Sequence, residues 1–396
     1  MEYFILLIVF LCYIGLVVGS FPVIRLNRAS IVFLVSSIII LTGFINLDDA
    51  IKSIDFKIII FLFGVMVVNS LIYFSGFFHW VSFKMFSNRK IFLLIKIVFI
   101  SAILSALFLN DTIAFVFTPV IIKICRDLKI DPKPYLISFM MSINIGSMAT
   151  ITGNPQNIIV ATKGNISYLE FLSALFLPTI ISLFFLIVLV ILFYPDLLSN
   201  QILQEEKKLD LFNEKNNRII HKPLFIKSFF IILLVLILLI LGIEPALVML
   251  IASSLVFFTR RIKSSKILSM VDFELLIIFS GLFVITEAIK DIISPFIELL
   301  YSKLGLLIST FILSQFISNV PAVLILLTKI KNHYDLFILS SSSTLAGNFT
   351  LLSSIANLIV LNFCQKFNIR IGFWEHFKIG SLITVISLIV IYLFLP

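Results

Sequence analysis

Charged residues are scarce in this sequence: they make up only 13% of it, whereas 60% of the residues are hydrophobic and the mean hydropathy is +1.17. A soluble globular protein carries about 25% charged residues because its surface faces water. The composition therefore excludes a soluble fold and predicts an all-α polytopic membrane protein. We expect a multi-pass protein of the plasma membrane, with the lipid bilayer as its surroundings.

Motifs for several kinds of chemistry are also absent. Cys12, Cys125 and Cys364 form no C-x-x-C pair and no metal-ligand spacing, which argues against a disulfide framework or a zinc site. The phosphate-binding pattern G-x-x-x-x-G-K-[ST] does not occur, so nothing indicates ATP hydrolysis. No nucleophile–base pair or metal constellation points to an enzyme. We therefore expect no cofactor beyond a coupling ion, Na⁺ or H⁺, whose gradient supplies the energy.

Long apolar runs are plentiful instead. About ten of them approach the roughly 20 residues that a helix needs to cross a hydrocarbon core of about 30 Å. These predicted spans lie near residues 3–20, 29–46, 58–78, 135–162, 172–194, 224–242, 246–259, 273–290, 336–364 and 376–395. Two further apolar stretches, 91–124 and 304–328, carry polar residues near their middles. This pattern favours a re-entrant hairpin in each, with two full spans apiece as the alternative.

The stretch 135–164 is long enough to cross a bilayer but is interrupted at 150–157 by Thr-Ile-Thr-Gly-Asn-Pro-Gln-Asn. An unpaired amide in hydrocarbon costs several kcal/mol, so an unwound segment survives there only where it lines a cavity or binds a ligand. Unwinding is expected to leave free carbonyl oxygens near Thr150 and free N–H groups near Asn157, which attract cations and anions respectively. The break therefore predicts a binding site.

The net charge of +9 does not indicate a nucleic-acid partner, because the basic residues are concentrated in the loops on one side of the predicted membrane spans. With the spans above, about 22 of them fall on one face and about 7 on the other, while Lys96 lies inside a hairpin. The basic face is predicted to be cytoplasmic. Both termini are then outside, and the polar stretch 196–222 is a cytoplasmic linker.

The second half of the chain repeats the order of elements of the first at offsets of about 200 to 217 residues. Residues 105–110 match 314–319, and Asn157 matches Asn357. Each copy contains five full spans and one hairpin. Because five is an odd number, the second copy enters the membrane from the opposite side and is inverted relative to the first. We therefore predict two inverted repeats, residues 1–195 and 223–396, each with one broken helix. Their hairpin tips and breaks are expected to converge near the midplane.

Polar side chains gather at these tips and breaks, and their oxygen atoms suit Na⁺. The predicted substrate- and ion-binding residues are Asn110, Asp111, Thr112, Thr150, Thr152, Gly153, Asn154, Pro155, Asn157, Ser318, Asn319, Pro321, Gly347, Asn348, Thr350, Ser353, Ser354 and Asn357. The candidate Na⁺ ligands among them are Asn110, Asp111, Thr150 and Asn154. Hydrogen bonding between helices is the alternative role for these residue types.

Asp111 is the strongest single candidate, because a charge deep in a membrane is a functional candidate by default. It is predicted to bind the coupling cation or a proton. The alternative is a helix N-cap for the second arm of the hairpin, a role that the Asn-Asp-Thr run also suits.

At these positions the sequence resembles the ion transporter superfamily, which includes arsenite permeases, sodium/proton antiporters, and citrate and dicarboxylate/sodium symporters. The resemblance covers nearly the whole chain and is carried by residues 110–119, 144–157, 318–321 and 344–357. It implies a homodimer whose hairpin tips and broken helices bind Na⁺ and substrate, and a transport domain that moves as a unit. The dicarboxylate branch has Ser-Asn-Thr at both tips, so Asp111 makes this chain more similar to the arsenite-permease and antiporter side.

We therefore expect a secondary active transporter that moves a small anion, an inorganic oxyanion or a carboxylate, coupled to a Na⁺ or H⁺ gradient. An arsenite efflux permease or a Na⁺/H⁺ antiporter is the alternative within the superfamily. A passive anion channel is the alternative from another functional class.

Overall fold

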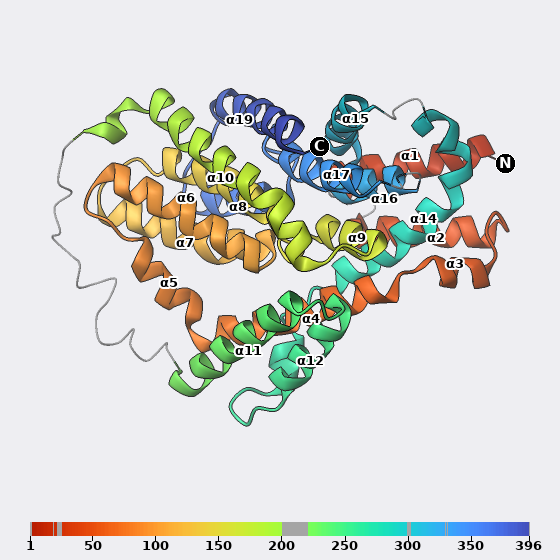
Figure 1. The fold of residues 1–396 in the computed structure, drawn as a ribbon, viewed down its shortest axis with the longest axis horizontal. Helices are drawn as coiled ribbons and strands as arrows, with labels where there is room; N and C mark the ends of the chain where they lie inside the picture. The colour runs from red at the N-terminus through yellow and green to blue at the C-terminus, as the bar shows by residue number, and fades with distance from the viewer. Residues whose placement is uncertain are drawn as a thin grey trace.

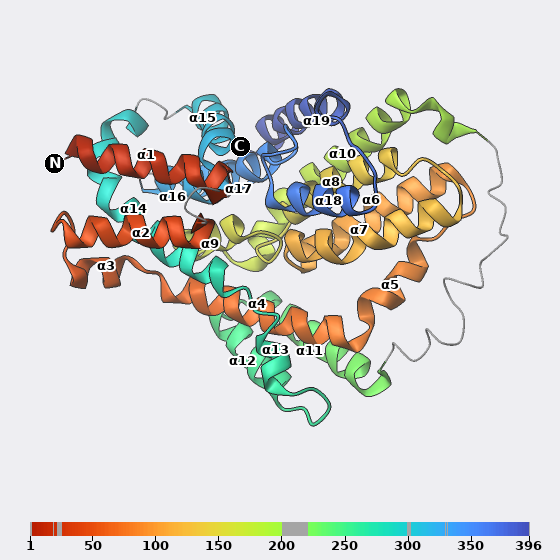
Figure 2. The ribbon, with the colours of Figure 1, turned by 180° about the vertical axis from the view of Figure 1, so that it is seen from behind.

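The computed structural model of the protein describes residues 2–18, 20–21, 26–199, 221–298, 302–328, 330 and 332–395. Nearly all of this is helical (Figures 1 and 2). The one sheet in these ranges pairs β1 (Ser20–Phe21) antiparallel with β2 (Leu26–Asn27). A helix satisfies its backbone hydrogen bonds internally, as hydrocarbon demands. The predicted all-α class is confirmed.

The helices of the first half precede the predicted linker. They are α1 (Glu2–Val18), α2 (Arg28–Leu41), α3 (Leu47–Ser53), α4 (Phe56–Ser75), α5 (Phe77–Met85), α6 (Lys90–Leu107), α7 (Asn110–Asp127), α8 (Lys133–Ser147), α9 (Pro155–Gly164), α10 (Tyr168–Phe193) and the 3-10 helix η1 (Pro195–Leu198). The helices of the second half are α11 (Lys222–Ile240), α12 (Pro245–Phe257), α13 (Ser264–Leu268), α14 (Phe273–Glu298), α15 (Lys303–Ile317), α16 (Asn319–Leu327), α17 (His333–Ala346), α18 (Ile355–Lys366) and α19 (Phe373–Phe394).

Five of the described helices are long and apolar enough to cross a membrane: α4, α6, α10, α11 and α19. The helices α1, α2, α12 and α15 are also apolar but shorter. Large apolar side chains such as Phe10, Phe33, Phe184 and Phe229 point outward, where water would penalise them and lipid would not. The chain is therefore a multi-pass membrane protein, as its composition predicts.

The described helices pack as two groups. In the first, which we call the α4 lobe (α1–α4 and α11–α14), α4 packs against α11 and α12, and α2 packs against α14. In the second, the α8 lobe (α6–α10 and α15–α19), α6 packs against α8, α15 against α17, α10 against α19, and α7 against α18. In Figure 1 the α4 lobe occupies the lower and right-hand part, and the α8 lobe lies in the upper left and centre.

Close approach of α6 and α8 depends on Gly146. A side chain at this position would collide with the backbone of Ala102 on α6. Glycine therefore lets the two backbones come together in the middle of the α8 lobe, just before α8 ends.

Two helices are interrupted. The first stops at Ser147 and resumes at Pro155, and the second stops at Ala346 and resumes at Ile355. The predicted break is confirmed, although α9 begins earlier than expected and includes residues 155–157. Proline suits the first helical position because its missing N–H would have no partner there, so Pro155 opens α9.

The predicted hairpins, 91–124 and 304–328, are pairs of helices with very short junctions. Phe108 and Leu109 separate α6 from α7, and Ser318 alone separates α15 from α16. The predicted linker, 196–222, falls mostly on residues 200–220, which lie outside the described residues. Near its start, Asp196 forms an ion pair with Lys90 at 2.6 Å.

Candidate functional site

The site is organised around Asn144, a buried side chain near the end of α8. Its Nδ2 donates to Oδ1 of Asn348 at 3.0 Å and lies 3.4 Å from Oδ1 of Asn357. Its Oδ1 accepts from Nδ2 of Asn110 and from Oγ of Ser354, both at 3.2 Å. One amide therefore joins the start of α7 to the second break. A carboxamide suits this position because it both donates and accepts.

Each break is closed by an asparagine from the helix that follows it. Nδ2 of Asn157 donates to the carbonyl oxygens of Ser147 and Thr150, both at 2.8 Å. Nδ2 of Asn357 donates to the carbonyl oxygens of Gly347 at 2.8 Å and Thr350 at 3.3 Å. The same bonds thus recur 200 positions later in the chain. They also correct the expectation of a free carbonyl at Thr150, because the unwound chain folds back and Asn157 satisfies it.

The α17 helix reaches across to the first break as α8 reaches to the second. Oδ1 of Asn157 accepts from Oγ of Ser340 at 2.7 Å and lies 3.4 Å from Oγ1 of Thr344. The Thr344 hydroxyl in turn accepts from Nε2 of Gln156 at 3.1 Å and from Nδ2 of Asn154 at 3.5 Å. Thr344 and Asn144 therefore hold corresponding places in two matching sets of contacts.

The junction between α6 and α7 rests directly on the first break. The backbone N–H of Asn110 donates to the carbonyl oxygen of Gly153 at 3.2 Å. The hydroxyls of Thr150 and Thr152 both donate to the carbonyl oxygen of Ala106, the latter at 2.9 Å. Tip and break are thus one polar assembly, which brings together the predicted residues Asn110, Thr150, Thr152, Gly153, Asn154 and Asn157.

Asp111 is half-buried and lies in the first turn of α7, where a carboxylate is favoured by the helix dipole. The N-cap position of α7 is Leu109, and no side chain caps it, so the N-cap alternative for Asp111 is wrong. Within the described ranges its carboxylate has no hydrogen bond or ion pair, and the charged groups near it are Arg28 and Asp272. Beside it, Thr112 Oγ1 accepts from Nδ2 of Asn69, across the two lobes, at 3.4 Å.

The second tip is built differently. Ser318 has φ +74° and ψ 161°, a backbone region that is almost confined to glycine and costs about 1–3 kcal/mol for other residues. Oδ1 of the neighbouring Asn319 is buried without a partner among the described residues. The side chains of Ser318, Asn319 and Pro321 form no described hydrogen bond with the Asn144 assembly. The second tip meets the second break through α15 instead, where Nε2 of Gln315 donates to the carbonyl oxygen of Ala346 at 2.7 Å.

A cavity of about 330 Å³ adjoins this second tip, between α2 and α14 of the α4 lobe and α15, α16 and α18 of the α8 lobe. Its wall includes five of the predicted site residues: Ser318, Pro321, Thr350, Ser353 and Ser354. Another cavity, of about 490 Å³, is lined by Lys163, Glu287 and His333 and by none of the predicted site residues. Of these two cavities, the one beside the second break is the one that predicted site residues line.

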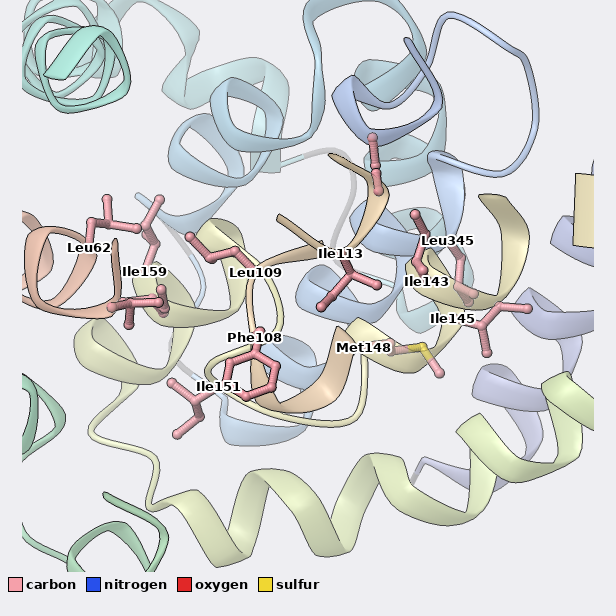
Figure 3. Packing of buried hydrophobic residues seen from close by; sticks show 14 of the residues in the cluster. Leu62, Phe108, Leu109, Ile113, Ile143, Ile145, Met148, Ile151, Ile159 and Leu345 are labelled. Atoms are coloured by element: carbon pink, nitrogen blue, oxygen red, sulfur yellow. The ribbon is translucent and has the colours of Figure 1, made fainter. Parts of the chain in front are cut away.

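Apolar side chains surround the polar assembly. Figure 3 shows Phe108 and Leu109 at the α6–α7 junction, Met148 and Ile151 in the first break, and Leu345 near the end of α17. All five are buried. A low local dielectric strengthens the hydrogen bonds that it encloses.

Two residues of this assembly, Asn144 and Thr344, were not among the predicted binding residues, although they begin the stretches 144–157 and 344–357 that carry the family resemblance. Each is a buried polar residue in the last turn of its helix, since α8 ends at Ser147 and α17 at Ala346. A signal for both was their matching place in the two halves, 200 residues apart.

The sequence is similar to those of known transporters. The family model described as citrate transporter (CitMHS) matches residues 13–335. An uncharacterized transporter of Methanocaldococcus jannaschii is 30% identical over 89% of this chain and 93% of its own length. An uncharacterized transporter of Mycobacterium tuberculosis is 26% identical, with 94% of each chain covered. The silicon efflux transporter LSI3 of Oryza sativa subsp. japonica is 26% identical over 91% of this chain and 90% of its own length.

These relatives are transporters rather than enzymes, and each is matched over most of its length. The ion transporter resemblance read from the tips and breaks is confirmed by the family match. The chain therefore belongs to the citrate transporter family of membrane transporters.

Proposed function

We propose that the protein is a secondary active transporter that moves a small anion, an inorganic oxyanion or a carboxylate, using a Na⁺ or H⁺ gradient. The observation that carries the proposal is the pair of interrupted helices, each closed by an asparagine and tied to the opposite half of the chain. Interrupted helices at matching places are typical of transporters that expose one site alternately to the two sides of the membrane.

The inverted repeats, 1–195 and 223–396, are part of this proposal. They are supported by reciprocal contacts: Asn144 to Asn357 is the counterpart of Thr344 to Asn157, at 3.4 Å in both cases. Re-entrant hairpins at 91–124 and 304–328 are supported by the short α6–α7 and α15–α16 junctions. With this arrangement both termini lie outside, and the linker 196–222 is cytoplasmic.

For the coupling ion we propose a site at the first tip, with Asp111 as its charged group. Support comes from the half-buried carboxylate, which has no described hydrogen-bond partner. Further support comes from the adjacent Asn110, whose backbone N–H donates to the carbonyl oxygen of Gly153 and so joins this tip to the break that contains Thr150 and Asn154. Because a carboxylate binds Na⁺ or a proton, both coupling ions fit. The same carboxylate favours the second candidate, an arsenite efflux permease or a Na⁺/H⁺ antiporter.

The resemblance also implies a homodimer in the plasma membrane, which we propose without a particular interface. Mass measurement of the protein in nanodiscs tests the dimer, and a monomeric mass would contradict it.

Transport in proteoliposomes tests the main proposal. Citrate, phosphate, arsenate, arsenite and silicic acid should be screened under imposed Na⁺ and pH gradients, with empty liposomes as the control. We expect saturable flux of at least one anion that requires one of the gradients. Single-channel currents, or flux that ignores both gradients, would instead establish the passive anion channel. Gradient-driven movement of Na⁺ and H⁺ alone would establish the antiporter.

A further inference from the structure

We infer that Arg28 is the anion-binding residue of the cavity between the lobes, and that the anion lies between its guanidinium and the first turn of α18. This inference deepens the proposed function, because it rests on an anion being the transported substrate. It names a residue whose charge otherwise counts only toward membrane orientation.

Arg28 opens α2 and lines the cavity of about 330 Å³. A cation at the first position of a helix is disfavoured by the helix dipole, so its placement needs another reason. Its Nε donates to the carbonyl oxygen of Leu16 at 2.9 Å, which fixes the plane of the guanidinium. Its other N–H groups have no partner among the described residues. A held guanidinium with free donors suits a carboxylate or an oxyanion, which it binds through two parallel hydrogen bonds.

The cavity wall also includes the start of α18, a helix of 12 residues. Its N-cap residue, Ser354, makes no capping bond, so the first N–H groups of α18 lack a side-chain acceptor. Ser354 and Ile355 both line the cavity. Unpaired N–H groups and the positive end of a helix dipole attract an anion, in addition to the charge of Arg28.

A buried hydroxyl points to a ligand independently of this helix end. Oγ of Ser314 on α15 has no partner among the described residues, although Ser314 is only 1% exposed and lines the same cavity. Buried polar atoms are normally hydrogen-bonded, so an unpaired one calls for a missing partner. An anion oxygen in this cavity would supply that partner.

The size and charge of the cavity restrict the ligand. A volume of about 330 Å³ is at the small end of ligand pockets, which suits an anion of few atoms with some water. Leu275 and Phe279 supply apolar wall, which strengthens the attraction to Arg28. Asp111 lies close enough to interact with Arg28 electrostatically, so a cation or proton on Asp111 strengthens anion binding here. Binding of the cation at Asp111 and binding of the anion at Arg28 are then linked through the electrostatic interaction between these two side chains.

The test compares Arg28→Gln and Arg28→Lys with Arg370→Gln, an exposed arginine outside the cavity. The probe is the anion that wild-type proteoliposomes take up fastest among citrate, phosphate and arsenate. We expect Arg28→Gln to raise its KM by about 10- to 100-fold, as for loss of a charged hydrogen-bond partner. Arg28→Lys should give an intermediate KM, because lysine keeps the charge and loses the paired geometry. Arg370→Gln should match wild type.

Ser314→Ala provides an independent variant if Arg28→Gln does not fold, and it should raise KM by a few-fold without lowering the melting temperature. Unchanged KM in Arg28→Lys and Ser314→Ala, with wild-type melting temperatures, overturns this inference and leaves anion transport standing. If wild type takes up none of the three anions, the inference falls together with the proposed function.

Discussion

At the scale of the residue, asparagine carries most of the polar contacts. Asn144, Asn157 and Asn357 each donate through Nδ2 and accept through Oδ1, so each one connects two segments without a buried charge. Sequence reasoning found Asn157 because it follows Gly153 and Pro155, and Asn357 because it matches Asn157 in the second half. Asn144 belongs to the stretch that carries the family resemblance but was not predicted to bind a ligand, because its contacts appear only when α8 meets the second break.

Asn144→Asp tests this central amide. The change replaces a donor by an acceptor that faces Oδ1 of Asn348, so we expect it to reduce the free energy of unfolding by about 1–3 kcal/mol. Thermal melting of the purified protein measures the loss. Asn88→Asp, at an exposed position just before α6, is the matched control and should change little. Equal melting temperatures for the two variants would show that the Asn144 amide does not stabilise the polar assembly.

Asp111→Asn tests the charge at the first tip. Because Asp111 caps no helix, the amide should fold normally, and we expect substrate uptake to be lost or to become independent of the Na⁺ and pH gradients. Uptake in proteoliposomes, with melting temperature measured alongside, is the readout. Asp127→Asn, an exposed position at the other end of α7, is the control. Wild-type rate and wild-type gradient dependence in Asp111→Asn would make the carboxylate structural.

At the scale of the element, the interruptions were predictable because Gly153, Asn154 and Pro155 all disfavour a continuous helix. How the unwound chain is satisfied was not predictable, since it depends on Asn157 folding back onto Ser147 and Thr150. Local sequence thus located the breaks, and three-dimensional contacts decided which atoms remain free. The same reason explains why Arg28 was read only as a marker of orientation.

Gly146→Ala tests the packing that positions the first break. A methyl group there collides with the Ala102 backbone, which cannot rotate away, so we expect α8 to shift and the free energy of unfolding to fall by about 1–3 kcal/mol. Thermal melting again measures the change, and transport should decline with it because Asn144 is displaced. Gly372→Ala meets no close atom and is the control. A wild-type melting temperature for Gly146→Ala would contradict the close approach of α6 and α8.

At the scale of the whole molecule, charge asymmetry predicts the orientation in the membrane. A cysteine placed at Asn213, in a background without Cys12, Cys125 and Cys364, should not react with an impermeant thiol reagent in intact cells. The same cysteine should react after the cells are permeabilised, which is the positive control. Labelling of this cysteine in intact cells would show that the linker is outside and that the proposed sidedness of both hairpins is wrong.

The two lobes are also connected by an ion pair between Lys163, at the end of α9, and Asp55, at the start of α4, with Nζ and Oδ2 2.8 Å apart. The side chain of Lys163 is 46% exposed and that of Asp55 is 13% exposed, so water screens the pair from the lysine side and we expect it to contribute about 1 kcal/mol. Such a contact biases a two-state population by no more than about fivefold. Thermal motion therefore breaks it readily, and added salt weakens it further. In the proposed transport cycle, a contact of this strength favours the arrangement of the lobes described here without preventing movement between them.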